Sequence, residues 1–153
     1  MKFTDKYNLP EAIKSADTRK VVTLKEPRED RKYIADNPNQ LFLTVYQVDG
    51  ALLKSQQPGD KKCDYAIYTS NDDLFLIELK GSNYSQALDQ MKKTLDCLLT
   101  PDLDALHSVN GRVVLSKTKV PATLETKEKK MMLLFGKLGG TLKKKSREFR
   151  EVV

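Results

Sequence analysis

The chain has 153 residues, of which 39% are apolar, and its formal net charge is +6 at pH 7. This is the size of one domain that can bury its own core, so we expect a single domain over residues 1–153. The two cysteines, Cys63 and Cys97, lack a CxxC partner or a nearby histidine, so the sequence suggests neither a disulfide framework nor a structural zinc site. Nothing in the sequence approaches the roughly 20 apolar residues that cross a bilayer, and the N-terminal segment has no apolar signal region. We therefore expect a cytoplasmic protein with reduced thiols and no membrane partner.

The positive charge is concentrated near the C-terminus. Residues 127–150 contain nine Lys or Arg and two acidic residues, a local balance of +7, so the remainder of the chain is at −1. A localised basic segment suits a polyanion, because neutralised phosphates release condensed counterions. On charge alone, a solubilising lysine surface explains this segment equally well.

The first forty residues are weakly patterned. Residues 9–20 are predicted as a short helix with Pro10 near its start, and residues 21–24 as a brief strand. Residues 25–40 are polar and end in an Asn-Pro turn signal. Residues 41–48 are rich in β-branched and aromatic side chains, which predicts a strand that ends at Asp49–Gly50.

The elements are clearer from residue 63 onward. Two apolar runs, 63–69 and 74–80, are separated by a short polar turn and predict a β-hairpin. A helix is predicted over about 84–99, a strand over 111–117, and an amphipathic helix over 125–138. This order of elements predicts an α/β or α+β fold built around the central hairpin.

Several kinds of chemistry are excluded by missing residues. His107 is the only histidine, so sites that need a histidine pair are disfavoured, and we expect His107 to be an ordinary surface residue. The sequence has neither a GxxxxGK[ST] phosphate loop nor a GxGxxG motif. Any catalysis must therefore depend on carboxylates, lysines and amides.

One such group of residues lies on the predicted hairpin. Side chains alternate along a strand, so Glu78 and Lys80 share a face at the end of an apolar run. Asp64 begins the partner strand, at the end of the hairpin away from its turn, and so lies beside them. Two carboxylates held close together suit Mg²⁺ or Mn²⁺, and a lysine can position an attacking water.

The register of the hairpin tests this grouping. Opposed residues in an antiparallel pair have position numbers with a constant sum, and their side chains share a face. A four-residue loop would turn Asp64 away from Glu78, whereas a three-residue loop places Asp64 opposite Glu78. A five-residue loop would instead place Asp64 opposite Lys80, and a β-bulge could also restore a shared face.

Residues 61–99 resemble the PD-(D/E)xK nuclease superfamily, which includes many restriction enzymes and junction resolvases. The resemblance implies a restriction-endonuclease-like core, with a central mixed β-sheet flanked by helices. It matches Asp64 to the first acidic metal ligand and Glu78 and Lys80 to the E-x-K pair. Cys63 stands where the family often has proline before the acidic residue.

Other site residues are implied by this resemblance alone. Gln90 matches a glutamine that helps to hold the site in several branches, with Gln86 as a second candidate, and the Leu79 carbonyl is implied as a further metal ligand. Many members also carry an acidic residue on an N-terminal helix. Glu11 is the first candidate for that residue here and Glu29 the second.

These observations predict an endonuclease that uses Mg²⁺ or Mn²⁺ to hydrolyse phosphodiester bonds, with DNA favoured over RNA. The alternative is a non-catalytic module that keeps the fold and binds nucleic acid or protein. If the chain is a nuclease, the C-terminal residues Lys143, Lys144, Lys145 and Arg147 are predicted to contact phosphates. A homodimer is a mild expectation by resemblance.

Overall fold

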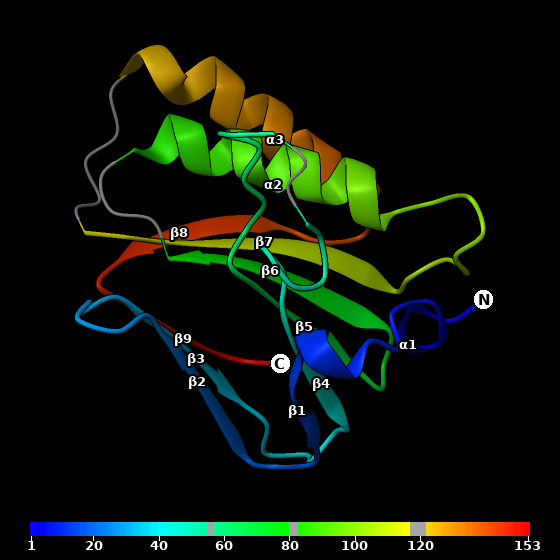
Figure 1. Cartoon of the computed structure of the whole chain (residues 1–153). Helices are drawn as coiled ribbons and strands as arrows, with labels where there is room; N and C mark the ends of the chain where they lie inside the picture. Colours follow the sequence, from blue (N-terminus) through cyan, green and yellow to red (C-terminus); the bar gives the residue numbers. More distant parts are fainter. Residues whose placement is uncertain (55–56, 80–82, 117–121) are drawn as a thin grey trace.

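A computed structural model describes residues 1–54, 57–79, 83–116 and 122–153, which form a mixed α/β fold (Figure 1). The central sheet is mixed and has six strands. In spatial order they are β1 (Ile13–Asp17), β4 (Leu43–Gln47), β5 (Tyr65–Thr69), β6 (Asp73–Leu79), β7 (Ser108–Leu115) and β8 (Leu142–Ser146). The second sheet has three strands, in the order β2 (Val21–Lys25), β3 (Lys32–Asp36) and β9 (Glu148–Val152).

Two long helices, α2 (Tyr84–Leu98) and α3 (Glu125–Lys137), cover one face of the central sheet (Figure 1). Three single-turn elements complete the fold: α1 (Phe3–Lys6), η1 (Pro10–Ala12) and η2 (Ala122–Leu124). Among the described residues, no helix has the length and apolar character required to cross a membrane.

The β5–β6 hairpin separates two hydrophobic cores. Its even-numbered positions, such as Leu74 and Leu76, pack with Leu88 and Met91 of α2. Its odd-numbered positions pack instead against the three-stranded sheet, in a cluster that contains Tyr33, Ile67, Phe75, Ile77 and Phe149. Both faces of the hairpin are therefore buried, as the apolar runs of the sequence predict.

The strand directions define two edges of the central sheet. The pairs β1–β4, β4–β5 and β5–β6 are antiparallel, whereas the pairs β6–β7 and β7–β8 are parallel. The last residues of the parallel strands, Leu79, Leu115 and Ser146, therefore meet at one edge, which we call the carboxyl edge. The β5–β6 turn lies at the opposite edge.

The strand over 21–24, the β5–β6 hairpin and the two long helices are confirmed, with small differences in their ends. Asn83 caps α2, because its side chain accepts a hydrogen bond from the Gln86 N–H at 2.9 Å. The helix predicted over residues 9–20 is wrong. That segment forms the short η1 turn and then β1, which pairs with β4 at the margin of the sheet.

Three further differences concern strands. The polar segment 25–40 contains β3, whose central residues Tyr33, Ile34 and Ala35 are buried. β7 begins at Ser108, directly after His107, rather than at residue 111. The basic segment is not a simple tail, since residues 142–152 form β8 and β9 in different sheets.

A buried ion pair joins the two sheets. Arg112 of β7 is 3% exposed, and its Nε lies 2.6 Å from Oε2 of Glu151 on β9. The same carboxylate oxygen accepts a hydrogen bond from the Tyr33 hydroxyl at 2.7 Å. The Arg112 guanidinium also lies over the rings of Phe75 and Phe149, 5.6 and 5.7 Å from their centroids. This network holds the C-terminal strand against the central sheet.

The Glu151→Ala substitution is expected to destabilise the protein by about 3–5 kcal/mol, because it leaves the buried Arg112 charge without its partner. Urea unfolding followed by circular dichroism measures this change. Asp36→Ala removes the partly exposed ion-pair partner of Arg150, which lies on the same strand as Glu151, and should have only a small effect. Equal losses in the free energy of unfolding for the two variants would show that the buried pair contributes no more to stability than the exposed one.

Candidate active site

Asp64 and Glu78 lie opposite each other on the β5–β6 hairpin. The hairpin has a three-residue turn and pairs Tyr65 with Ile77, so the next position of the register places Asp64 opposite Glu78. Their side chains therefore share a face of the sheet, the face that α2 covers. The three-residue alternative is thus the correct one among those that the sequence left open.

The two carboxylates have different surroundings. Oδ2 of Asp64 accepts a hydrogen bond of 2.9 Å from the Leu79 backbone N–H, which draws the carboxylate to the end of β6. Glu78 is 3% exposed, so its carboxylate is almost completely removed from water. A buried carboxylate is costly unless protein groups or a cation compensate it, which makes this pair unusual for an ordinary core.

α2 covers the candidate site with residues that the sequence did not single out. Oγ1 of Thr94 accepts a hydrogen bond from the Cys63 N–H at 2.9 Å and donates one to the Gln90 carbonyl at 2.7 Å. Burial, followed by the nearby Glu78 carboxylate, raises the pKa of the Cys63 thiol well above its usual value. Cys63 is thus a neutral thiol beside the acidic pair. Apolar spacing along the helix could have located Thr94 on this face.

Gln90 has an unsatisfied buried atom. Its side chain is 5% exposed, and its Oε1 has no hydrogen-bond partner among the residues that the structure describes. A buried amide oxygen without a partner is rare in folded proteins and calls for an explanation. Gln90 lies one helical turn from Thr94 on the buried face of α2, whereas Gln86 is exposed. Of the two glutamines that the resemblance implies, the structure thus buries Gln90 and leaves Gln86 exposed.

Other predicted site residues are placed less closely. Lys80 lies outside the described residues, and Leu79 ends β6 beside Asp64. Glu11 is exposed in the η1 turn, and Glu29 is ion-paired with Arg31 in the β2–β3 connection. Within residues 1–54, 57–79, 83–116 and 122–153, no three His, Cys, Asp or Glu side chains form a metal-binding group.

The basic residues of the C-terminal segment do not form one surface. Lys144 turns toward the helices, where it pairs with Glu128 of α3 and lies 5.2 Å from the Tyr84 ring centroid. Lys143 and Lys145 alternate with it and occupy the other face of β8. Arg147 lies in the connection from β8 to β9 at the carboxyl edge.

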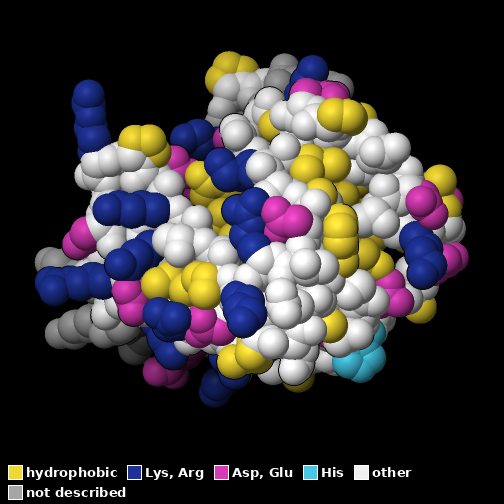
Figure 2. Space-filling view, turned by 90° about the horizontal axis from the view of Figure 1, so that it is seen from below, with side chains coloured by type: hydrophobic (Ala, Val, Ile, Leu, Met, Phe, Trp, Pro, Cys, Tyr) yellow, Lys and Arg dark blue, Asp and Glu magenta, His cyan; other side chains and the backbone are white. Residues whose placement is uncertain are grey.

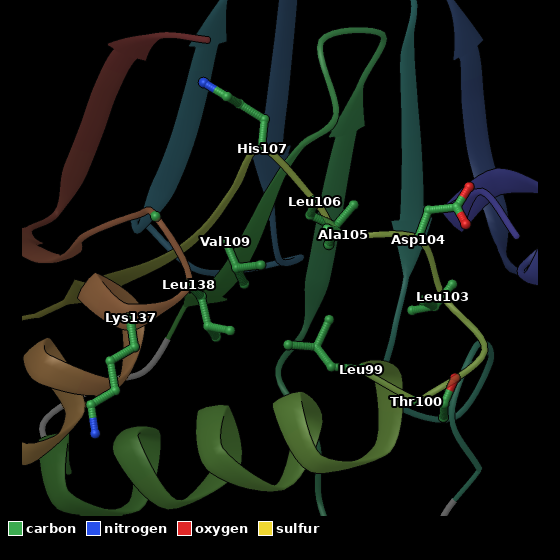
Figure 3. A pocket seen from close by; sticks show the side chains of 11 residues that line it. Leu99, Thr100, Leu103, Asp104, Ala105, Leu106, His107, Val109, Lys137 and Leu138 are labelled. Atoms are coloured by element: carbon green, nitrogen blue, oxygen red, sulfur yellow. The ribbon is translucent and has the colours of Figure 1, made fainter.

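A pocket of about 440 Å³ is lined by residues that include neither Asp64 nor Glu78. Figure 3 shows that its side chains come from the end of α2, the segment leading into β7 and the end of α3. This places the pocket at the edge opposite the carboxyl edge. His107 at its rim is exposed as predicted, and Asp73 raises its pKa through a contact of 2.6 Å. The pocket offers no pair of carboxylates for metal-dependent chemistry.

Comparisons of the chain with protein-family models, with curated proteins and with solved structures found no match.

Gln90→Met should hold or raise the free energy of unfolding in the presence of EDTA, by up to about 1–3 kcal/mol, because it removes an unsatisfied buried oxygen at similar volume. Chemical unfolding with and without Mn²⁺ measures both states. The same variant should lose part of any stabilisation by Mn²⁺. A clear loss of stability without metal would mean that the amide has a structural partner.

The two cysteines should differ sharply in reactivity. Cys63 is fully buried with a raised pKa, whereas Cys97 is exposed. Iodoacetamide at neutral pH should therefore label Cys97 in the folded protein and reach Cys63 only after unfolding. Mass spectrometry of the labelled peptides reports both sites, and equal labelling in the folded state would contradict the placement of Cys63.

Proposed function

We propose that this protein is a metal-dependent nuclease of the PD-(D/E)xK type, acting on DNA, with its active site at the carboxyl edge. The observation that carries the proposal is the hairpin register, which puts Asp64 and Glu78 on one face at opposed positions. This arrangement arises from a three-residue turn that is fixed independently of any site. It is the geometry that two carboxylates need in order to share an ion.

The donor set suits a hard divalent cation. Asp64 and Glu78 supply carboxylate oxygens, and the Leu79 carbonyl is the further ligand that the resemblance implies. Gln90 contributes an amide oxygen that has no partner in the described part of the chain. Mg²⁺ and Mn²⁺ prefer such oxygen ligands. When bound, the ion would supply electrostatic stabilisation of the charge that develops on a phosphodiester.

The protein's own residues have distinct tasks in this proposal. The Leu79 N–H fixes the Asp64 carboxylate before any ligand arrives, which lowers the cost of reorganisation. The helical cover over Glu78 excludes water from one side of the carboxylate pair. Lys80 is proposed to orient the attacking water and to offset the charge of the two acids.

A non-catalytic binding module with the same fold is the second candidate. It is favoured by the small number of acidic ligands, because the described residues contain a pair of acids and no larger group. The two candidate functions differ in one measurable respect. A binding module would bind nucleic acid or protein without cleaving it at any metal concentration.

The charge-removing variants Asp64→Asn and Glu78→Gln should each reduce cleavage by about 100-fold or more, because each weakens metal binding without a large change of volume. The assay uses supercoiled plasmid, branched DNA and RNA with Mg²⁺ or Mn²⁺, and EDTA should abolish activity in every case. Lys80→Ala should lower the rate with less effect on Mn²⁺ affinity, measured by calorimetry.

Asp89→Asn is the matched control for these variants. Asp89 is an exposed carboxylate on α2 that pairs with Lys127, so its neutralisation should leave cleavage at the wild-type rate. Unfolding curves establish that each variant is folded. Wild-type cleavage by either site variant, or an absence of cleavage on all substrates with both metals, would overturn the proposed function.

A further inference from the structure

Two arginines lack the partners that the others have. The chain has six arginines, and four of them pair with a carboxylate: Arg19 with Asp17, Arg31 with Glu29, Arg112 with Glu151 and Arg150 with Asp36. Arg28 and Arg147 are exposed, and within the described chain neither guanidinium has a hydrogen bond or an ion pair. Their charges therefore contribute no contact to the described fold.

The same two arginines have a strained backbone. Arg28 and Arg147 each have a φ of 65°, in the left-handed region that glycine adopts at no steric cost. The described chain has two other non-glycine residues of this kind, Gln40 and Asp72. Asp72 belongs to a residue type that is enriched in this conformation, whereas arginine is not. Two unpaired arginines thus occupy positions where glycine would be the more stable choice.

Arg28 stands at the tip of the β2–β3 hairpin. The Glu29 N–H donates to the Glu26 carbonyl at 3.2 Å and closes a turn with Pro27 and Arg28 at its centre. Proline at the second position and a positive φ at the third are typical of a type II turn, in which the third residue is usually glycine or asparagine. The Tyr65 hydroxyl donates to Oε1 of Glu26 at 2.8 Å, which ties this turn to the residue after Asp64.

Arg147 is the single residue that carries the chain from β8 in one sheet to β9 in the other. Its N–H donates to the carbonyl of Leu115, the last residue of β7, at 2.7 Å. Its carbonyl accepts from the N–H of Lys32, the first residue of β3, at 2.9 Å. Arg147 and the Arg28 turn therefore lie at the same edge of the molecule, the carboxyl edge that ends with Leu79 (Figure 1).

The positive surface charge is concentrated at the same end of the molecule. Figure 2 shows Lys and Arg side chains gathered at the end of the molecule away from the single histidine, His107. His107 precedes β7 and so marks the edge opposite the carboxyl edge. The exposed Lys25 and Lys145 lie at the same end of the molecule as Arg28 and Arg147.

We propose that Arg28 and Arg147 form a pair of phosphate clamps that hold the backbone of duplex DNA across the carboxyl edge, which rests on the proposed nuclease function. A guanidinium fork binds phosphate through two parallel hydrogen bonds, and a rigid backbone corner limits the entropy lost on binding. Neither guanidinium makes a hydrogen bond or ion pair inside the described chain that would offset the strained backbone. The proposal replaces the four-residue basic cluster predicted from the C-terminal sequence with two separate chain segments.

The decisive variants are Arg28→Gly and Arg147→Gly, because each removes the clamp and relieves the backbone strain together. Each should hold Tm or raise it by up to about 4 °C. Each should also weaken binding to all duplex sequences alike and reduce the log-log salt slope by about 0.9. Fluorescence anisotropy of a labelled duplex, titrated with salt in EDTA, measures binding without cleavage. Single-stranded DNA and RNA probes are run in parallel, and tighter, equally Arg-dependent binding to either would overturn the assignment to duplex DNA.

Three controls separate charge from strain. Gln40→Gly relieves a positive φ at the other edge and should change stability without changing the salt slope. Arg150→Gln removes one exposed positive charge that is already paired with Asp36, and should also leave the slope unchanged. Arg147→Lys keeps the charge and the strain, and should recover most of the slope while binding less tightly than wild type.

The outcomes distinguish this proposal from the nuclease proposal. Wild-type affinity and slope in both glycine variants, with cleavage intact, would overturn the clamps and leave the nuclease standing. Loss of slope in the glycine variants of a protein that never cleaves would support the clamps and reject the nuclease. A fall in Tm of both variants would show that the arginines are structural, and would also overturn the proposal.

Discussion

The register of the β5–β6 hairpin is the constraint on which the rest of the structure depends. Its turn is three residues long, with Asp72 in the left-handed conformation, and Oγ1 of Thr69 accepts from the Asn71 N–H at 3.2 Å. A turn of this length fixes which residues of the two strands are opposed. Because side chains alternate, a slip of one residue in either strand would exchange its two faces. Such a slip would disrupt both hydrophobic cores and would separate Asp64 from Glu78. The candidate site is therefore a consequence of how the core is registered.

The parts of the fold that could be predicted are those whose signals are local. The hairpin and α2 have strong periodicities of two and 3.6 residues, because each packs on a continuous apolar layer. β1 and β3 were missed for different reasons. β1 has a half-exposed pattern at the margin of the sheet, and β3 places three buried residues inside a charged segment. The partner of β3 on one side is β9, more than a hundred residues later, so its burial depends on a contact that no local window contains.

The difference between local and distant signals also explains how much of the site could be predicted from the sequence. Strand parity limited the hairpin to a few arrangements, and the three-residue turn, which pairs Asp64 with Glu78, was one of them. A predicted strand over Lys143, Lys144 and Lys145 would have placed their side chains on alternate faces. Their charge instead suggested a solvated segment. The unpaired state of Arg28 and Arg147 could not have been anticipated. It depends on which carboxylates the fold brings to the other four arginines, and those partners lie on several strands.

The candidate site lies near groups that weaken the fold around it. Gln90 is a buried amide whose oxygen has no hydrogen-bond partner among the described residues. The two exposed arginines at the carboxyl edge have a strained backbone, and their guanidinium groups make no hydrogen bond or ion pair within the described chain. An unsatisfied buried oxygen and a strained backbone each cost stability. Residues that oppose folding are expected where a ligand provides the missing interactions. The stabilising network of Arg112, Glu151 and Tyr33 lies between the two sheets, apart from that edge. It can supply rigidity to the site without occupying the space that a substrate would need.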